Sequence, residues 1–398
     1  MNKPVMAQNT PRGTVVPGQA EGSRWLTVTS PLLPSMQDLV PRIADMLERK
    51  WLTNQGHYAC QLETELARFL GVSELSLVTN GTIALDMAIR ELVDGGEVIT
   101  TGFSFPATWA TLVDDPRYTP VFVDIGADCT LDPQAVEAAI TPKTTAIVGV
   151  HAYGFPCQHQ TLKAIADRHG LKLLYDAAHA FGVEVDGESV GAWGDASIFS
   201  FHATKVFNTL EGGAIASADR DYMRRIGARR NFGLVGGGVQ EMVGTNGKMD
   251  ELRSIFGLAV LPLVREAIAR RESVAQRYLE AIAGLNIEEI HLFSEPFSRS
   301  GVRQNFAYFP IMVRPGSGMN RDQLWQALHD VGVLSRRYFN PTVVTAPMYA
   351  DLVRPGSLPE TIRASASALC LPIHHDMTSS DCDLVVNTIS AAYRNVTG

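Results

Sequence analysis

The chain has 398 residues, of which 45% are hydrophobic and 19% charged, a balance typical of a globular protein large enough for two domains. Its 34 basic and 42 acidic residues give a net charge of −8, which argues against a general nucleic-acid binder. No apolar stretch approaches the roughly 20 residues that span a bilayer, so we do not expect a membrane protein.

The first predicted elements follow a polar N-terminal segment. Residues 1–24 are rich in Pro, Gly and Gln, lack the apolar core of a signal peptide, and are expected to form a disordered tail. Apolar residues then recur with helical spacing at 36–49 and at 57–71, where Gly71 is placed to end the second helix. Both segments are therefore predicted to be amphipathic helices.

The middle of the chain alternates apolar strand-like runs with helical segments. Strands are predicted at 74–80, 97–101, 119–125, 145–154, 172–178 and 196–201, and helices at 81–92, 108–115, 132–140 and 160–170. This alternation predicts an α/β fold with a mostly parallel sheet covered by helices on both faces. The run 234–240 contains three glycines without a strand–turn–helix setting, and it is predicted to be a flexible loop.

The pattern changes from about residue 251. A long helical stretch is predicted there, interrupted or kinked at Pro262, and it precedes a strand at 306–313 and helices at 321–332 and 380–395. We therefore expect a large α/β domain over residues 25–260 and a smaller α+β domain over residues 261–398.

The five cysteines are Cys60, Cys129, Cys157, Cys370 and Cys382. Their odd number and the absence of a CxxC pair fit neither a disulfide framework nor a zinc site. We therefore expect reduced thiols, no bound metal and a cytoplasmic location.

Two residues at predicted strand ends have distinctive chemistry. Lys205 lies in SFHATKVFNTLEGG, just after the strand 196–201, and Asp176 lies near the end of the strand 172–178. Taken alone, a lysine is usually a solvated surface charge, and an aspartate in this setting is often a helix N-cap. Together they are the two groups that a pyridoxal phosphate site needs most, a lysine that forms a Schiff base and a carboxylate that holds the pyridine nitrogen.

Other strand ends offer groups for the rest of that cofactor. Gly81 and Thr82 begin a helix, whose N-terminal N–H groups favour a phosphate, and the Ser200 hydroxyl can donate to it as well. Phe105 follows a strand, where its ring can stack on a pyridine face, although a core position is the commoner role of such a residue. In open α/β sheets ligands bind at the carboxyl ends of strands, so these residues are expected to converge.

At this point the sequence resembles a known family. The segments GTIALDMAI, SFPAT, GVHAYGFP, YDAAHAFG, SFHATKVFNTLEGG and GTNGKMDEL are similar to those of the DegT-type nucleotide-sugar aminotransferases. The resemblance runs from about residue 30 to the C-terminus. It implies pyridoxal phosphate as cofactor and the fold type I architecture, which is that of aspartate aminotransferase.

The resemblance also implies roles for individual residues. Lys205 is then the Schiff-base lysine, Asp176 holds the ring nitrogen, His179 lies near the ring hydroxyl and Phe105 stacks on the ring. The phosphate would be held by Gly81, Thr82 and Ser200, together with Asn246 from the neighbouring subunit, which implies a homodimer with shared active sites. Lys248 stands where the family often has arginine, and lysine does not reproduce the bidentate contact of an arginine.

The implied activity is amino transfer from an amino acid, with glutamate as donor, to a nucleotide-linked keto-deoxysugar. The residues of the motifs FNTLEGG and GTNGKM are most similar to those of the family branch that acts at carbon 4 of dTDP-4-keto-6-deoxyhexoses. Three alternatives stay open: transfer at carbon 3, a non-catalytic regulatory protein that binds pyridoxal phosphate, and another fold type I enzyme such as a lyase or decarboxylase. A dehydratase branch of the family has histidine at the lysine position, so Lys205 favours transamination.

Four residues are candidates for contacts to the substrate: His202, Arg336, Arg337 and Tyr338. Two adjacent arginines beside an aromatic ring suit a carboxylate or a diphosphate. A solvated surface pair explains the arginines equally well, and a structural role is the favoured interpretation of His202.

Overall fold

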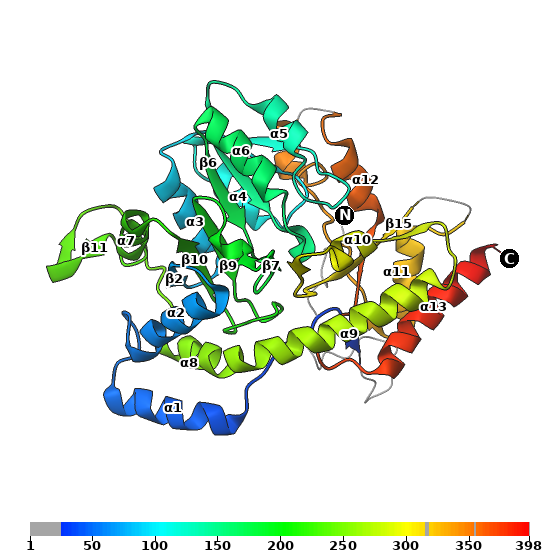
Figure 1. The fold of residues 1–398 in the computed structure, drawn as a ribbon, viewed down its shortest axis with the longest axis horizontal. Coiled ribbons are helices and arrows are strands. Elements are labelled where there is room, and N and C mark those ends of the chain that lie inside the picture. The colour runs from blue at the N-terminus through cyan, green and yellow to red at the C-terminus, as the bar shows by residue number, and fades with distance from the viewer. Residues whose placement is uncertain (1–24, 315–317, 354–355, 398) are drawn as a thin grey trace, which may run out of the picture.

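The computed structural model describes residues 25–314, 318–353 and 356–397, so the predicted tail at 1–24 lies outside the described residues. Its centre is a seven-stranded sheet in the order β2-β10-β9-β6-β5-β3-β4 (Figure 1). These strands are β2 (Glu74–Val78), β3 (Gly96–Thr101), β4 (Tyr118–Val123), β5 (Thr144–Val150), β6 (Lys172–Asp176), β9 (Ala196–Ser200) and β10 (Gly213–Ser217). Only β10 runs antiparallel to its neighbours, so the predicted α/β class with a mostly parallel sheet is confirmed.

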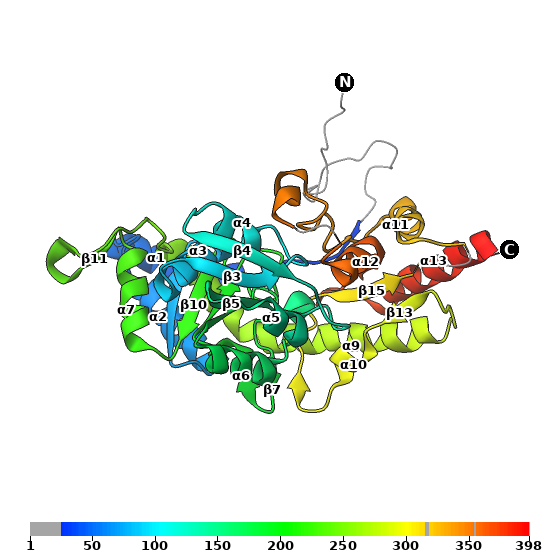
Figure 2. The ribbon, with the colours of Figure 1, turned by 90° about the horizontal axis from the view of Figure 1, so that it is seen from above.

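Helices cover both faces of this sheet (Figure 2). One face carries α3 (Gly81–Leu92), α4 (Ala107–Val113) and α7 (Arg220–Arg229), and the other carries α2 (His57–Leu70), α5 (Pro133–Ala139) and α6 (His159–His169). Side chains along β6 alternate between the two faces of the sheet, as the strand period of two requires. Leu173 and Tyr175 pack into one hydrophobic core, and Leu174 packs into the other. Burial on both faces explains why these strands read as continuous apolar runs.

The long helical stretch after residue 250 is two helices joined by a turn. They are α8 (Glu251–Val260) and α9 (Val264–Ala283), and between them the 3-10 turn η4 (Leu261–Leu263) contains Pro262. The predicted interruption at Pro262 is therefore confirmed. Helix α9 leads away from the central sheet to the C-terminal part of the chain (Figure 1).

The C-terminal part contains an antiparallel sheet in the order β13-β15-β17. Its strands are β13 (Ile290–Leu292), β15 (Phe309–Val313) and β17 (Ala368–Leu371), and its main helices are α11 (Arg321–Asp330), α12 (Pro359–Ser367) and α13 (Ser379–Thr397). Near the start of the described chain, β1 (Leu26–Thr27) pairs with β16 (Val333–Leu334) in this part. The α+β character agrees with the prediction, while the domain boundary near residue 260 stays a prediction.

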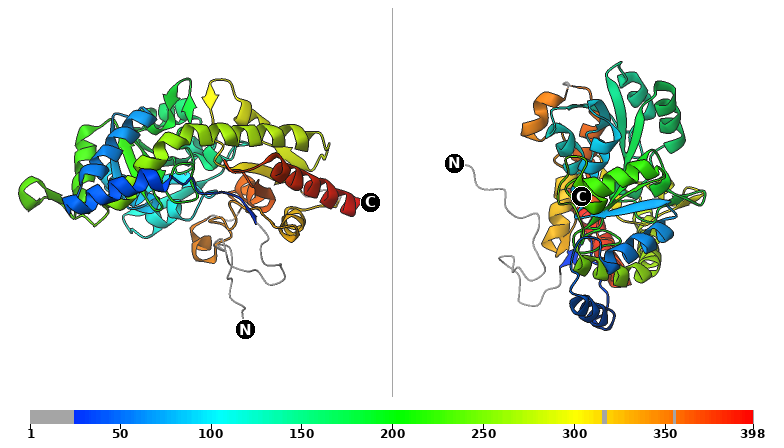
Figure 3. Two further views of the ribbon diagram at one scale, coloured as in Figure 1. Left: turned by 90° about the horizontal axis from the view of Figure 1, so that it is seen from below. Right: turned by 90° about the vertical axis from the view of Figure 1, so that its left-hand side faces the viewer.

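The smaller elements complete the chain. They are α1 (Met36–Arg49), η1 (Ala152–Gly154), β7 (Glu184–Val185), β8 (Glu188–Ser189), η2 (Val190–Ala192), α10 (Ser294–Ser298), β14 (Val302–Arg303) and η5 (Pro347–Leu352). The predicted flexible loop at 234–240 is instead a short hairpin, in which β11 (Leu234–Val235) and β12 (Val239–Gln240) flank the glycine turn η3 (Gly236–Gly238). Figure 3 shows this hairpin projecting from the end of the molecule opposite α13.

Over the described ranges, no helix combines the length and the apolar character needed to cross a membrane. Within the same ranges no three His, Cys, Asp or Glu side chains gather as a metal site would require, and all five cysteines are free.

Candidate active site

A cavity of about 450 Å³ lies at the carboxyl edge of the central sheet. Parallel strands deliver their C-terminal residues to one edge, and here β6 ends at Asp176 and β9 at Ser200. Most of the residues singled out from the sequence line this cavity: Gly81, Thr82, Phe105, Asp176, His179, Ser200, His202, Lys205, Arg336 and Tyr338.

Asp176 is buried, and both of its carboxylate oxygens are fixed by hydrogen bonds. The Thr108 hydroxyl donates to Oδ2 over 2.9 Å, and the Ala178 backbone N–H donates to Oδ1 over 3.0 Å. Burial raises the pKa of Asp176, while the two hydrogen bonds and the nearby Lys205 lower it. A cation brought to this carboxylate would therefore meet an acceptor whose orientation is already set.

Lys205 follows β9 in the loop that leads into β10. Burial lowers the pKa of its amine to about 8, an effect that Asp176 opposes and Arg336 reinforces. Its Nζ atom lies 6.0 Å from the centre of the Tyr308 ring. An amine with this pKa is partly unprotonated near neutral pH, as a nucleophile or a general base must be.

The N-terminus of α3 forms a cradle beside β9. The Asn80 side chain caps the helix by accepting a hydrogen bond of 2.8 Å from the Ile83 N–H. A Cβ atom at Gly81 would lie 2.8 Å from the Cβ of Ser200, so only glycine allows the helix to begin this close to the strand. The first turn of α3 and the hydroxyls of Thr82 and Ser200 thus form an anion cradle at the cavity wall.

Aromatic rings also line the cavity. His179 is buried, and its ring stacks on Phe339 with the ring centres 5.7 Å apart and the planes at 2°. Burial, together with the charge of Lys205, lowers the pKa of His179 well below its usual value, so the imidazole is neutral. Phe105 lines the cavity with a side chain that is 56% exposed, which leaves its ring available for stacking.

The cavity lining also includes polar groups of His202, Glu211, Arg336 and Tyr338. His202 Nδ1 is 2.8 Å from the Thr204 hydroxyl, and its Nε2 is 3.5 Å from a Glu211 carboxylate oxygen. Arg336 donates to the Tyr338 hydroxyl over 2.5 Å. A ligand in the cavity would therefore meet the guanidinium of Arg336 and the hydroxyl groups of Thr204 and Tyr338.

Two sequence candidates do not line the cavity. The Arg337 guanidinium lies 4.6 Å from the centre of the Trp325 ring and binds Asp322 over 3.1 Å. Asn246 is exposed and pairs through its backbone with Asn231, outside this cavity.

Comparisons with known proteins agree with this geometry. The model of the DegT/DnrJ/EryC1/StrS aminotransferase family matches residues 35–390. The chain belongs to this family. It is therefore a sugar aminotransferase, an enzyme whose cofactor is pyridoxal phosphate.

Individual relatives resemble the chain over nearly its whole length. A dTDP-4-amino-4,6-dideoxy-D-glucose transaminase of Shigella dysenteriae is 39% identical over 91% of this chain and 97% of its own. A dTDP-3-amino-3,4,6-trideoxy-alpha-D-glucose transaminase of Micromonospora megalomicea is 34% identical over 82% of this chain and 87% of its own. The crystal structure of DesI in the presence of its TDP-sugar product has a TM-score of 0.88 and 36% identity, covering 95% of both chains.

The residues of this aminotransferase fit its cofactor. The cradle at Gly81 offers N–H and hydroxyl donors to a phosphate, and Asp176 offers a fixed carboxylate to a protonated ring nitrogen. Phe105 offers a ring face, and Lys205 offers the amine. The donor set thus matches the phosphate, the ring and the aldehyde of pyridoxal phosphate in turn.

Sequence reasoning missed several residues of this site. Thr108 lies within the quoted motif SFPAT, but nothing in the sequence indicated that its hydroxyl would bind Asp176. Tyr308 and Phe339 come from the C-terminal part, and Glu211 from the FNTLEGG motif. Tyr308 lay within the strand predicted at 306–313, whereas the observed strand β15 begins at Phe309, and an aromatic residue in a predicted strand did not distinguish a cavity wall from a core.

Proposed function

We propose that this enzyme transfers an amino group to carbon 4 of a dTDP-linked 4-keto-6-deoxyhexose, with glutamate as the amino donor. The observation that carries the proposal is the convergence of Lys205 and Asp176 on one cavity of about 450 Å³. That volume lies in the range of sites for small molecules and cofactors, roughly 300–1,000 Å³. The choice of sugar is supported by the relatives named above, which carry dTDP- or TDP-sugars in their names.

Within this proposal each residue has one task. When bound, pyridoxal phosphate would supply a ring that accepts electrons and an aldehyde carbon that carries the amino group from the donor to the sugar. Asp176 holds a proton on the ring nitrogen, and the cradle at Gly81 and Ser200 binds the phosphate. Lys205 Nζ would remove the proton from the donor α-carbon as a base and then deliver it, as an acid, to the cofactor carbon that carries the amino group.

We assign contacts to the two substrates to polar side chains of the cavity lining. Arg336 lines the cavity, and we assign its guanidinium to the donor carboxylate, with Tyr338 holding it in place. We assign His202 and Glu211 to the sugar, because their hydrogen-bonding atoms suit hydroxyl groups. Arg337 is left out of this assignment because Asp322 and Trp325 hold it.

We also propose that two copies of the chain share their active sites. Asn246 is exposed, and it would reach the phosphate cradle of a second subunit. Apolar side chains in the same region favour a buried interface: Val243 is 82% exposed, and Phe232 and Val239 are also exposed. A cytoplasmic location is part of the proposal, because free cysteines persist in a reducing compartment.

Transfer at carbon 3 is the second candidate. It is favoured by the Micromonospora relative, whose name places its amino group on carbon 3. The cavity lining does not discriminate between the two carbons, so identification of the product must decide.

The experiment that tests the activity is a half-reaction followed by absorbance between ~300 and 500 nm, where the cofactor absorbs. Enzyme loaded with pyridoxal phosphate is expected to lose its yellow band on addition of glutamate and to regain it with the keto sugar. Lys205→Ala is expected to abolish both changes, whereas Lys163→Ala, an exposed lysine paired with Asp167 on α6, is expected to behave as wild type. Normal turnover by Lys205→Ala would refute the assignment.

A further inference from the structure

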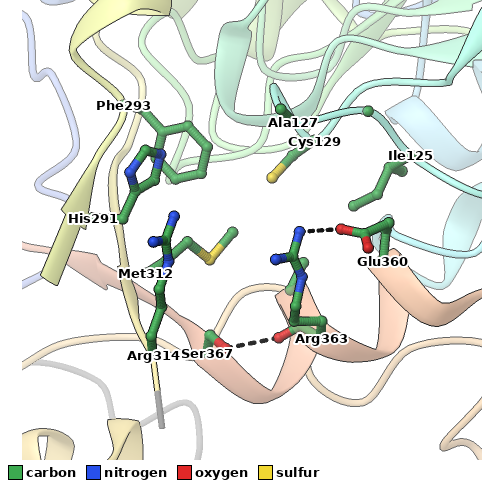
Figure 4. Close-up of a pocket in the computed structure, with 12 residues that line it drawn as sticks. Ile125, Ala127, Cys129, His291, Phe293, Met312, Arg314, Glu360, Arg363 and Ser367 are labelled. Carbon is green, nitrogen blue, oxygen red and sulfur yellow. Dashed lines mark hydrogen bonds and ion pairs between the residues drawn. The ribbon is translucent and has the colours of Figure 1, made fainter. Parts of the chain in front are cut away.

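A second cavity, of about 170 Å³, shares no lining residue with the active site. The loop Ile125–Cys129 after β4 forms one wall, and β13, β15 and α12 contribute the others (Figure 4). It therefore lies where the central sheet meets the C-terminal part. The N-terminus of α12 is fixed beside it, because Asp124 accepts hydrogen bonds from the N–H groups of Glu360 and Thr361 over 2.8 and 2.7 Å.

The floor of this cavity is apolar and buried. Cys129, Phe293 and Met312 are each less than 10% exposed, and Ala364 of α12 is buried beside them. Side chains of this kind favour a hydrocarbon or aromatic body over water. The volume suits such a ligand, because an engineered apolar cavity of about 150 Å³ in another protein accepts benzene.

The rim of the cavity is cationic. Figure 4 shows the guanidinium groups of Arg314 and Arg363 on either side of the Met312 thioether, with the His291 ring above them. Arg363 pairs with Glu360, whereas the side chain of Arg314 makes no hydrogen bond or ion pair with any residue that the structure describes. Cations above an apolar floor form a site for an amphipathic anion.

The charge balance indicates how many negative charges the ligand carries. Burial and the two neighbouring arginines lower the pKa of His291, so its ring is neutral at pH 7. Among the side chains that line the cavity, two arginines and one glutamate then give a net charge of +1. One carboxylate neutralises this charge, whereas a dianion would be left with an unpaired charge over an apolar floor.

We propose that this cavity is an accessory site for a small organic monocarboxylate. Its carboxylate binds Arg314 and Arg363, and its apolar body packs on Phe293 and Met312. The site is separate from the reaction: Tyr308 lines the active site just before β15, and Arg314 follows the same strand six residues later. At the usual rise per residue of a strand, that separation is about 20 Å.

Benzoate is the probe that tests this site, measured by isothermal titration calorimetry on the full-length enzyme loaded with pyridoxal phosphate. We expect saturable binding that weakens at least ten-fold in Arg314→Gln and in Ala127→Phe, which fills the cavity from an exposed position without changing its charge. Arg270→Gln is the matched control, because Arg270 is an exposed arginine on α9 that pairs with Glu266 and lies outside the cavity. Its affinity for benzoate should equal that of the wild type.

Two further ligands test the chemical class. Benzyl alcohol has nearly the shape of benzoate without the charge, and inorganic phosphate has charge without the apolar body, so each should bind at least ten-fold more weakly. Equal binding of phosphate would overturn the organic carboxylate, and the absence of saturable benzoate binding would overturn the site. Benzoate binding that survives Arg314→Gln but is lost in Arg336→Gln would assign the ligand to the active site instead, which also refutes the proposal.

Discussion

Lys205 owes its reactivity to burial. An ordinary lysine has a pKa of 10.5, but desolvation brings that of Lys205 down to about 8, even though the Asp176 carboxylate acts in the opposite direction. The positive charge of Lys205 is therefore lost as the pH rises through about 8. Half of its amine is neutral at that pH, and the neutral amine is the form that the proposed role as nucleophile and base requires.

This titration can be measured without turnover. In enzyme freed of cofactor, competitive labelling with acetic anhydride should modify Lys205 with a midpoint near pH 8, because only the neutral amine reacts. Asp176→Asn should move the midpoint to lower pH, since it removes the carboxylate that raises the pKa. A wild-type midpoint near 10.5 would show that the amine is solvated and not tuned by the site.

Replacing Asp176 by asparagine should lower activity without lowering stability. Asp176→Asn keeps the shape of the side chain and removes the charge that would hold the ring nitrogen protonated, so kcat/KM should fall by about 100-fold or more. The melting temperature of the Asp176→Asn variant should not fall. Burial disfavours the charged carboxylate of the wild type, and the neutral amide of the variant does not carry that cost. Steady-state kinetics and thermal denaturation measure both effects. A loss of activity that merely tracks a loss of stability would make Asp176 structural.

At the scale of elements, the sequence predicted those with a strong apolar period. The predicted strands near 97–101 and 196–201 and the helices near 36–49 and 81–92 are present within one or two residues of their expected bounds. β10 was missed because its sequence, GAIAS, is short and built of small residues. Its first residue must be small, since a Cβ at Gly213 would lie 2.6 Å from the carbonyl of Asn80. That requirement comes from tertiary packing, which local periodicity does not report.

The cradle offers a test of how closely two elements must approach. Gly81→Ala places a Cβ 2.8 Å from that of Ser200, so α3 and β9 must separate and the phosphate contacts must loosen. Affinity for pyridoxal phosphate, titrated into the cofactor-free enzyme, should fall at least ten-fold. Gly227→Ala in α7 is the matched control, because no atom lies within 4 Å of the added Cβ. Alanine there should leave affinity unchanged and stabilise the helix by up to about 1 kcal/mol. If both variants bound pyridoxal phosphate with equal affinity, the cradle at Gly81 would not be part of the cofactor site.

For the whole molecule, convergence at the carboxyl edge of the sheet could be predicted, but the contribution of the C-terminal part could not. Strand order in an α/β sheet brings Asp176, Ser200 and Lys205 together by a general rule. No such rule places Tyr308 and Arg336 against them, because that depends on how the two parts of the chain pack. For the same reason, the sequence could not indicate which of the two adjacent arginines lines the cavity. Arg336 lines it, whereas Arg337 binds Asp322.

The proposal that two chains share their active sites can be tested by complementation. If Asn246 serves the neighbouring subunit, a mixed dimer of Lys205→Ala and Asn246→Ala chains contains one site with both defects and one intact site. Two inactive or weakened proteins should therefore regain activity after they are unfolded and refolded together, up to about one quarter of wild type for random pairing. If Asn246 acted within its own subunit, every site of the mixed dimer would carry one defect. Refolding the two variants together would then restore no activity.

The most direct test of the central claim is the structure of the product. Wild-type enzyme is incubated with glutamate and dTDP-4-keto-6-deoxyglucose, and the sugar formed is analysed by two-dimensional NMR while 2-oxoglutarate is quantified. We expect nitrogen bound to carbon 4 of the sugar and one equivalent of 2-oxoglutarate per amino sugar. Nitrogen on carbon 3, or release of ammonia without any amino sugar, would contradict it.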